Sequence, residues 1–356
     1  MEGRRERATA LAKGLPLVSE DLATVTWLTG LVTDIEWGPS PFSAPPAVVL
    51  DPDGSLLLVA SEDEAPGAAE DVDVRTFPGF AVEDVDRAAA SAELVLGALD
   101  GARELAVELA SLPGDLVREL DRRGVELVDV RADLRAARAV KDADELKAIR
   151  AALAVADAGQ AAARAALAPG RSELEAWTET RAAMEGVAGG RLPVLADFVS
   201  GPRTADVGGP PGERTFEAED LLLVDLVPRV GAYWADSCAT VALGDARAAV
   251  RDAHRSAREA LERAIAAVRP GAVAGELDEL AREIAGGYPH HTGHGIGTTT
   301  HEEPRIVPGS GRVLEAGMVV AFEPGSYGDD WGVRVEQVVV VTEDGADVIS
   351  GHDVSL

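Results

Sequence analysis

The sequence predicts a mixed α/β (α+β) protein with two domains. A chain of 356 residues with 46% hydrophobic residues is long enough to bury two cores. Up to about residue 135, short apolar runs alternate with helical patterns, which is typical of mixed α/β domains. A helix-start signal at Asp142 opens a second part that holds most of the clustered histidines and acids. We therefore expect one domain over 1–138 and another over 139–356.

The first part carries fold signals but no recognisable site. Four apolar runs predict strands at 47–50, 56–59, 105–109 and 125–128, and the pattern at 82–99 predicts a helix. No phosphate-binding glycine loop and no group of histidines or acids with ligand spacing occurs there. The proline-stiffened segment that follows Trp37 is interpreted as an ordinary loop with one anchoring aromatic residue.

The second part repeats one order of elements. Asp142 with Glu145, and Ser172 with Glu175, have the spacing of helix capping boxes, and further helices are expected at 246–268 and 275–284. Each pair of helices precedes apolar strands that carry acids around a turn. This order suggests a duplicated α/β unit with a site between its halves.

Charge and composition exclude several functions. Sixty-two acids against 33 bases give a net charge of −29, which repels nucleic-acid phosphates and anionic lipids. No apolar run approaches the roughly 18 residues of a membrane span, and the first residues lack a signal-peptide core, so we expect a cytoplasmic protein. The single cysteine, Cys238, excludes an internal disulfide and is expected to pack in a core. The sequence does not distinguish an adaptation to salt from other causes of the acid excess.

A glycine-rich histidine segment at 290–304 is the strongest chemical signal. It contains four of the six histidines, namely His290, His291, His294 and His301. Glycines between them allow close approach of the backbone, and histidine is the commonest metal ligand. By contrast, His254 is expected on a helix surface and His352 in the C-terminal tail.

Two pairs of acids flank this segment. A two-residue turn at 230–231 would place Asp225 directly opposite Asp236, with Cβ atoms about 5 Å apart. A turn at 329–330 would place Glu323 opposite Glu336. Each such pair of like charges costs on the order of 4 kcal/mol at an effective dielectric near 20, so the four carboxylates require cations.

Two divalent ions would balance the four carboxylates. His294 adds a nitrogen donor to this oxygen-rich set, which suits Mn, Co, Fe or Zn better than a thiolate-preferring metal. The sequence therefore predicts a dinuclear metal site.

These residues resemble the pita-bread metallopeptidases, in particular the Xaa-Pro aminopeptidase and prolidase branch. The matching motifs are Asp225 and Asp236 eleven residues apart, the Gly-His-Gly around His294, the His-Glu at His301, the Glu-Pro-Gly at Glu323 and the Val-Arg-Val-Glu ending at Glu336. The resemblance implies a creatinase/prolidase-like N-terminal domain over 1–138 and a pita-bread catalytic domain over 139–356.

The resemblance also implies a chemistry and a set of roles. A hydroxide bridging two metal ions, with Mn most expected and Co, Zn or Fe as alternatives, would attack the amide bond before proline. The substrate is then a peptide, and a homodimer is expected. The residues fall into three sets: metal ligands Asp225, Asp236, His294, Glu323 and Glu336; catalytic residues His301, Glu323 and His290; and substrate-binding residues His290, His301, Arg334 and Tyr233.

Three positions depart from the family pattern. Gly208 stands where these peptidases usually carry a histidine, Ala239 replaces an arginine and Val227 a glycine. Gly208 is expected to open a space of about one imidazole ring beside the metals and to weaken activity on simple Xaa-Pro dipeptides. Hydrolysis of a small non-peptide molecule and an inactive binding module remain alternatives, and aminopeptidase and dipeptidase activity are both open.

Overall fold

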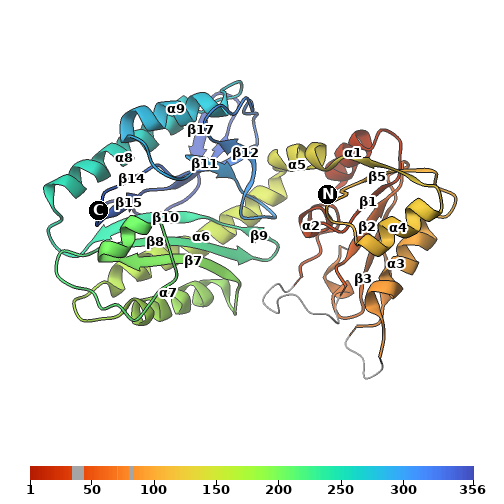
Figure 1. Cartoon of the computed structure of the whole chain (residues 1–356), viewed down its shortest axis with the longest axis horizontal. Helices are drawn as coiled ribbons and strands as arrows, with labels where there is room; N and C mark the ends of the chain where they lie inside the picture. The colour runs from red at the N-terminus through yellow and green to blue at the C-terminus, as the bar shows by residue number, and fades with distance from the viewer. Residues whose placement is uncertain (34–43, 70, 80–83) are drawn as a thin grey trace. The chain divides into compact units, whose positions relative to one another are not determined.

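A computed structural model describes residues 1–33, 44–69, 71–79 and 84–356. The expected Trp37 loop and the first two residues of the expected helix at 82–99 lie outside this range. The chain divides into two compact units, Met1–Arg138 and Ala139–Leu356 (Figure 1). Each unit is described by itself.

The N-terminal unit is built on a six-stranded sheet in the order β4-β3-β2-β1-β5-β6. Its strands are β1 (Leu17–Ser19), β2 (Ala47–Leu50), β3 (Leu56–Ser61), β4 (Asp73–Phe77), β5 (Glu104–Val107) and β6 (Glu126–Asp129). Its α-helices are α1 (Glu2–Leu11), α2 (Leu22–Thr29), α3 (Arg87–Ala98), α4 (Gly114–Arg122) and α5 (Arg131–Ala139), the last of which ends one residue inside the second unit.

Alternating side chains give this sheet two buried faces. Along β2, Val48 and Leu50 pack in one core cluster, whereas Ala47 and Val49 pack in another. Four of the six strands are those expected from the apolar runs. Helix α3 begins later than expected because the Asp86 side chain accepts the backbone N–H of Ala89 and caps the helix there.

The C-terminal unit combines two larger sheets, a hairpin and four long helices. The sheet orders are β10-β8-β7, with β9 on β8, and β12-β11-β13-β16-β17. The strands are β7 (Val194–Ser200), β8 (Leu221–Val230), β9 (Tyr233–Trp234), β10 (Ser237–Ala242), β11 (Gly293–Gly295), β12 (Glu302–Ile306), β13 (Val319–Phe322), β14 (Gly325–Tyr327), β15 (Gly332–Arg334), β16 (Gln337–Val341) and β17 (Ala346–Val348). The helices are α6 (Ala143–Ala166), α7 (Glu173–Ala188), α8 (Ala248–Ala267) and α9 (Ala274–Ala285).

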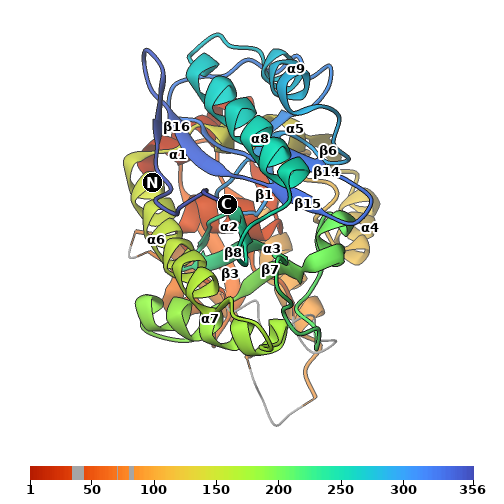
Figure 2. The same ribbon diagram turned by 90° about the vertical axis from the view of Figure 1, so that its left-hand side faces the viewer.

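Two pairs of helices cover the two sheets. Helices α6 and α7 run along β7 and β8, and α8 and α9 lie over the strands of the second sheet (Figures 1 and 2). Helix α6 also reaches the second sheet, since its Ile149 packs in one cluster with Val338 of β16. This double contact joins the halves of the unit, and the α/β class expected from the sequence is confirmed.

Local sequence explains where these helices begin and how closely they pack. The capping boxes expected at Asp142 with Glu145 and at Ser172 with Glu175 both form. Gly159 in α6 lies so close to the sheet that an added Cβ would be 2.6 Å from Leu226. A glycine is therefore required where α6 meets β8.

No helix in the described part of the chain is both long and apolar enough to cross a membrane.

Candidate metal centre

The first pair of acids is positioned by the β8–β10 hairpin. The two-residue turn lies at Gly231 and Ala232, so Asp225 pairs with Cys238 and not with Asp236. The expected pairing is therefore wrong by two residues. Side chains alternate along a strand, so a register shift of two residues does not change the face on which a side chain lies. Asp236 lies on the same face as Cys238, the partner of Asp225, and the two carboxylates therefore still converge.

The second pair of acids has the expected register. Phe322 pairs with Gln337 and, beyond a two-residue interruption, Gly325 pairs with Arg334, so Glu323 and Glu336 occupy facing positions. The chain turns at residues 329–330, as the sequence indicates.

A main-chain contact brings the two acid pairs together. The Glu336 N–H donates to the Cys238 carbonyl at 2.9 Å instead of to the neighbouring strand. As a result, oxygen atoms of Asp225, Asp236 and Glu336 all lie within 4.8 Å of one another.

His294 completes the group from β11, the strand between β12 and β13. Its Nε2 atom is 3.4 Å from Asp236 Oδ2 and 3.4 Å from Glu323 Oε1. Its Nδ1 lies 3.0 Å from the carbonyl oxygen of Gly295, which assigns the proton to Nδ1 and leaves the Nε2 lone pair toward the carboxylates. This arrangement is typical of a histidine that binds a metal.

The glycines beside His294 allow its strand to pack between two others. A Cβ at Gly293 would overlap the carbonyl oxygen of Ala321, and one at Gly295 would overlap that of Glu303. The glycine-rich segment therefore serves close strand packing as well as the site.

Burial makes the carboxylate group a strong attractor of positive charge. Burial and the nearby Asp236 raise the pKa of Asp225 well above its usual range, and the same two causes raise the pKa of Glu336. Among the described residues, buried Asp225 Oδ1 and Glu336 Oε1 have no hydrogen-bond partner. Burial alone would lower the pKa of His294, but hydrogen bonds from a proton on Nε2 to Asp236 and Glu323 raise it to about 10. A metal ion would have to displace this proton to reach the Nε2 lone pair.

These properties fit a pair of divalent cations. The set offers four carboxylates and one imidazole, it is buried, and it keeps unused acceptor atoms that a cation would satisfy. The five expected ligands are therefore brought together by the fold.

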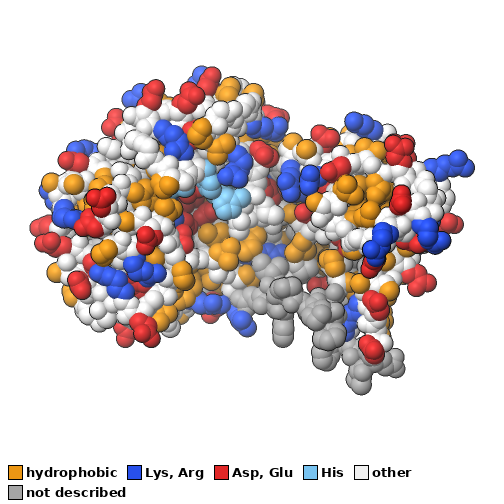
Figure 3. Space-filling model, viewed as in Figure 1, with side chains coloured by type: hydrophobic (Ala, Val, Ile, Leu, Met, Phe, Trp, Pro, Cys, Tyr) orange, Lys and Arg blue, Asp and Glu red, His pale blue; other side chains and the backbone are white. Residues whose placement is uncertain are grey.

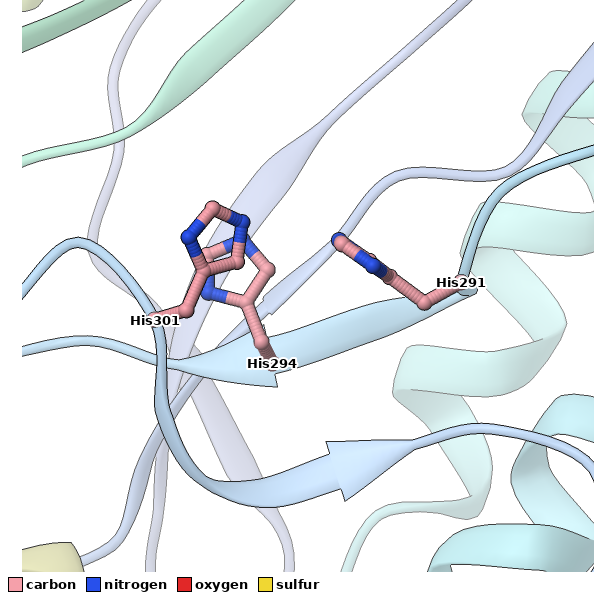
Figure 4. Close-up of side chains that lie close together, drawn as sticks. All are labelled: His291, His294 and His301. Atoms are coloured by element: carbon pink, nitrogen blue, oxygen red, sulfur yellow. The ribbon is translucent and has the colours of Figure 1, made fainter.

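The three other histidines of this segment lie at different depths around the candidate site. The His301 ring lies 4.1 Å from the His294 ring, and the His291 ring 5.1 Å from it (Figure 4). His301 is exposed, and Figure 3 shows histidine side chains that reach the surface beside acidic ones. His290 lies deeper, where its Nε2 accepts a hydrogen bond from the Tyr327 hydroxyl at 2.9 Å and burial lowers its pKa to about 4.

His291 is a site residue that the sequence reasoning did not assign. Its Nε2 lies 2.7 Å from Glu323 Oε1, and its Nδ1 accepts from Arg305 at 3.1 Å. Because arginine only donates, Nδ1 is unprotonated and Nε2–H donates to Glu323. His291 therefore holds a ligand carboxylate rather than offering a lone pair to a metal.

Arg334 and Tyr233 lie deeper than a substrate contact requires. The Arg334 side chain is 4% exposed and bonds Asp225 Oδ2 at 2.6 Å and the Val207 carbonyl at 3.0 Å. Tyr233 is buried, and its hydroxyl donates to Glu145 at 3.2 Å. We place Arg334 as a support for Asp225, and the expected substrate contacts of both residues stay predictions.

The open space expected at Gly208 is absent. A Cβ added to Gly208 would overlap the carboxylate of Asp197, which therefore fills the position of the missing side chain. Asp197 lies on β7 directly opposite Asp225 on β8. The sequence reasoning missed Asp197, although an antiparallel pairing of the two strands could have placed it beside Asp225.

Two histidines outside the site are also corrected. His254 was expected on a helix surface but is buried, with Nε2 3.0 Å from the Val354 carbonyl oxygen. His352 was expected in a free tail, yet it is buried with Nε2 3.3 Å from the Cys238 carbonyl oxygen. In both cases the C-terminal segment packs back onto the unit. Cys238 is buried, as expected.

The set of four carboxylates and one imidazole is that of a metal-dependent hydrolase. Comparisons with known proteins agree with this class. Residues 147–343, more than half of the chain, match the model of metallopeptidase family M24. A probable dipeptidase PepE of Mycobacterium bovis is 36% identical over 263 residues, which cover 71% of this chain and 70% of that protein. An Xaa-Pro dipeptidase of Pyrococcus horikoshii is 31% identical and covers 70% of this chain and 73% of its own length. The chain belongs to metallopeptidase family M24.

Solved structures extend the likeness to the whole chain. The prolidase of Pyrococcus horikoshii has a TM-score of 0.85 and 25% identity, covering 99% of both chains. Dipeptidase PepE of Mycobacterium ulcerans has a TM-score of 0.82 and 31% identity, covering 99% of this chain and 96% of that one. The fold is thus the pita-bread fold of the prolidases, and the protein is a metal-dependent peptidase. The non-peptide and inactive alternatives are not favoured.

Proposed function

We propose that this protein hydrolyses the amide bond before proline in short Xaa-Pro peptides, using two divalent metal ions. The proposal rests on the convergence of three carboxylates, from half-buried Asp225 and buried Asp236 and Glu336, beside His294 and Glu323. The names of the relatives, Xaa-Pro dipeptidase and prolidase, support proline as the second residue of the substrate.

Five side chains would hold the metals: Asp225, Asp236, His294, Glu323 and Glu336. Bound divalent ions supply Lewis acidity, which polarises a carbonyl and lowers the pKa of water. The donors are mostly hard oxygens, so we propose Mn²⁺ as the working metal, with Co²⁺, Zn²⁺ or Fe²⁺ as alternatives.

Neighbouring side chains would handle the substrate and its protons. His301 is exposed next to His294 and would donate a hydrogen bond to the carbonyl oxygen as negative charge develops there. The Glu323 carboxylate would take the proton of the attacking water and pass it to the leaving nitrogen. His291 holds Glu323 in place for this transfer.

A dipeptide and tripeptide panel tests the substrate class. Protein reconstituted with Mn²⁺ is expected to cleave Ala-Pro at least about tenfold faster than Ala-Ala, while Asp236→Ala should be inactive on both. Cleavage of Ala-Pro-Ala would add aminopeptidase activity, and its absence would leave a dipeptidase. Equal rates on Ala-Pro and Ala-Ala would refute specificity for proline.

Two further expectations stay predictions, namely the homodimer that the family likeness implies and the cytoplasmic location that the sequence indicates. Light scattering after size-exclusion chromatography would test the homodimer, with a single peak at one chain mass counting against it. Cell fractionation would test the cytoplasmic location.

A further inference from the structure

The position left by Gly208 is occupied by an acid. Because Gly208 has no Cβ, the Asp197 carboxylate lies where a side chain of residue 208 would begin. The family pattern has a basic imidazole at this position and this chain has a carboxylate. This part of the site therefore presents a negative charge where the resemblance predicts an imidazole.

Asp197 is held firmly in this place. Its Oδ1 accepts the N–H of Gly209 at 2.8 Å, and its Oδ2 lies 3.4 Å from Arg334 Nη2. The same Nη2 is 2.6 Å from Asp225 Oδ2, so the two carboxylate oxygens are no more than about 6 Å apart. Asp197 is therefore a fixed neighbour of the ligand group.

Asp197 also keeps acceptor capacity on its open side. Its side chain is 38% exposed, whereas those of Asp225 and Arg334 are 14% and 4% exposed. A carboxylate offers about four lone-pair sites, and two are directed to Gly209 and Arg334. Arg334 Nη2 lies 3.4 Å from Asp197 Oδ2 but only 2.6 Å from Asp225 Oδ2, so Arg334 neutralises Asp197 less completely than it neutralises Asp225.

We propose that Asp197 is a specificity-determining residue that binds a cationic group of the substrate. The inference rests on the proposed function, because it places that group beside the bond being cleaved. The cation is an ammonium or guanidinium, supplied either by a basic side chain of the first residue or by the peptide's amino terminus. A charge-assisted hydrogen bond of this kind favours such a substrate by roughly 10-fold or more over a neutral one of the same shape.

The test compares Lys-Pro with norleucine-Pro, which has the same number of side-chain carbons but no ammonium group, and with Glu-Pro. If the side chain supplies the cation, wild-type protein should prefer Lys-Pro to norleucine-Pro by about 10-fold in kcat/KM and should disfavour Glu-Pro. If the amino terminus supplies it, wild-type protein should cleave Lys-Pro and norleucine-Pro at similar kcat/KM. Asp197→Asn keeps the shape and the acceptor for Gly209 but removes the charge. Asp344→Asn, which removes an exposed acid from the turn before β17, is the matched control and should keep the wild-type preference.

The two sources of the cation give different results in Asp197→Asn. If kcat/KM falls only for Lys-Pro, the side chain supplies the cation. If kcat/KM falls equally for Lys-Pro and norleucine-Pro, the amino terminus supplies it. Unchanged kcat/KM for all three dipeptides in this variant would overturn the inference.

A binding measurement separates this inference from the proposed function. The same dipeptides are titrated calorimetrically into the full-length protein after chelation of metals. Tighter binding of Lys-Pro that is lost in Asp197→Asn supports the cation site even if no peptide is hydrolysed, in which case only the proposed activity fails. Equal binding of all three dipeptides by wild type and variant would overturn the cation site.

Discussion

At the scale of single residues, hydrogen bonds separate the histidines into different roles. His294 directs Nε2 at the carboxylates because its Nδ1–H donates to a carbonyl. His291 directs an N–H at Glu323 because Arg305 donates to its other nitrogen. His301 has an exposed ring beside them. Under the proposed function, one segment would thus supply a metal ligand, a support for a ligand and a substrate contact.

We predict that His301→Ala retains bound metal but lowers kcat on Ala-Pro by roughly 100-fold, the usual effect of losing an oxyanion donor. Steady-state kinetics and elemental analysis of the same preparation measure the two quantities. A variant that loses its metal would instead make His301 a ligand, and full activity would remove it from the mechanism.

For His291 we predict an effect on metal affinity. His291→Ala removes the donor to Glu323 and should weaken binding of one metal ion by about 10- to 100-fold, as is usual for partners of ligand side chains. His291→Gln keeps an N–H near the position of Nε2 and should recover part of the affinity. Competition with a chromophoric chelator gives the constants, and identical values in wild type and both variants would contradict this role.

At the scale of elements, a buried ion pair fixes the loop that carries His301. Lys141 Nζ lies 2.5 Å from Glu302 Oε2, and Thr298 donates to the other oxygen at 3.0 Å. Gly297 leaves room for this pair, since a Cβ added at this position would lie 2.8 Å from the Lys141 ammonium. The segment before α6 therefore anchors the loop beside the metal centre.

We predict that Lys141→Met destabilises the fold by about 3–5 kcal/mol, because the Glu302 carboxylate stays buried without this ammonium. The double variant Lys141→Met, Glu302→Gln should recover much of the loss. Urea unfolding measures both. Asp252→Asn, which breaks an exposed pair with Arg255, is the control expected to change little. Additive effects of the two substitutions would show that the pair is not coupled.

In the N-terminal unit, burial raises the pKa of Glu20 to about 8 from a usual value of 4.5. The unfolded chain then binds fewer protons between these values, so stability falls as pH rises from 4.5 to 8. Glu20→Gln should remove this loss and be more stable than wild type by on the order of 4 kcal/mol at pH 8, with little difference at pH 4.5. Urea midpoints at both pH values test this, and a pH-independent difference would contradict it.

Sequence patterns were sufficient for elements whose signals are local. Capping boxes set the starts of α6 and α7, and apolar runs located most strands. The Glu323–Glu336 register followed from the turn at 329–330. The first hairpin was misplaced by two residues because two neighbouring two-residue turns, at 230–231 and 231–232, both include Gly231. Only the strand pairing decides between them.

Long-range contacts were beyond these patterns. Asp197 fills the space at Gly208 through a strand pairing, and nothing local to Gly208 indicates it. His254 and His352 are buried because the C-terminal segment packs back over distant elements. At Gly208, the space without a side chain is filled by a carboxylate from a residue eleven positions earlier in the chain.

At the scale of the whole molecule, the candidate site lies in one of the two compact units. Each of the five proposed metal ligands lies in Ala139–Leu356, as do Asp197, His291 and His301. A net charge of −29 gives the molecule a strongly negative field, which attracts divalent cations and cationic peptides and repels polyanions. The charge preference inferred for Asp197 has the same sign as this field.

The most direct test of the account is the metal content of the purified chain after reconstitution with Mn²⁺ or Co²⁺. We predict close to two ions per chain in wild type, because four facing carboxylates and His294 form the site. Asp236→Ala and Glu336→Ala should each lose metal and peptidase activity together. Wild-type protein that binds no divalent metal under these conditions would contradict the central claim.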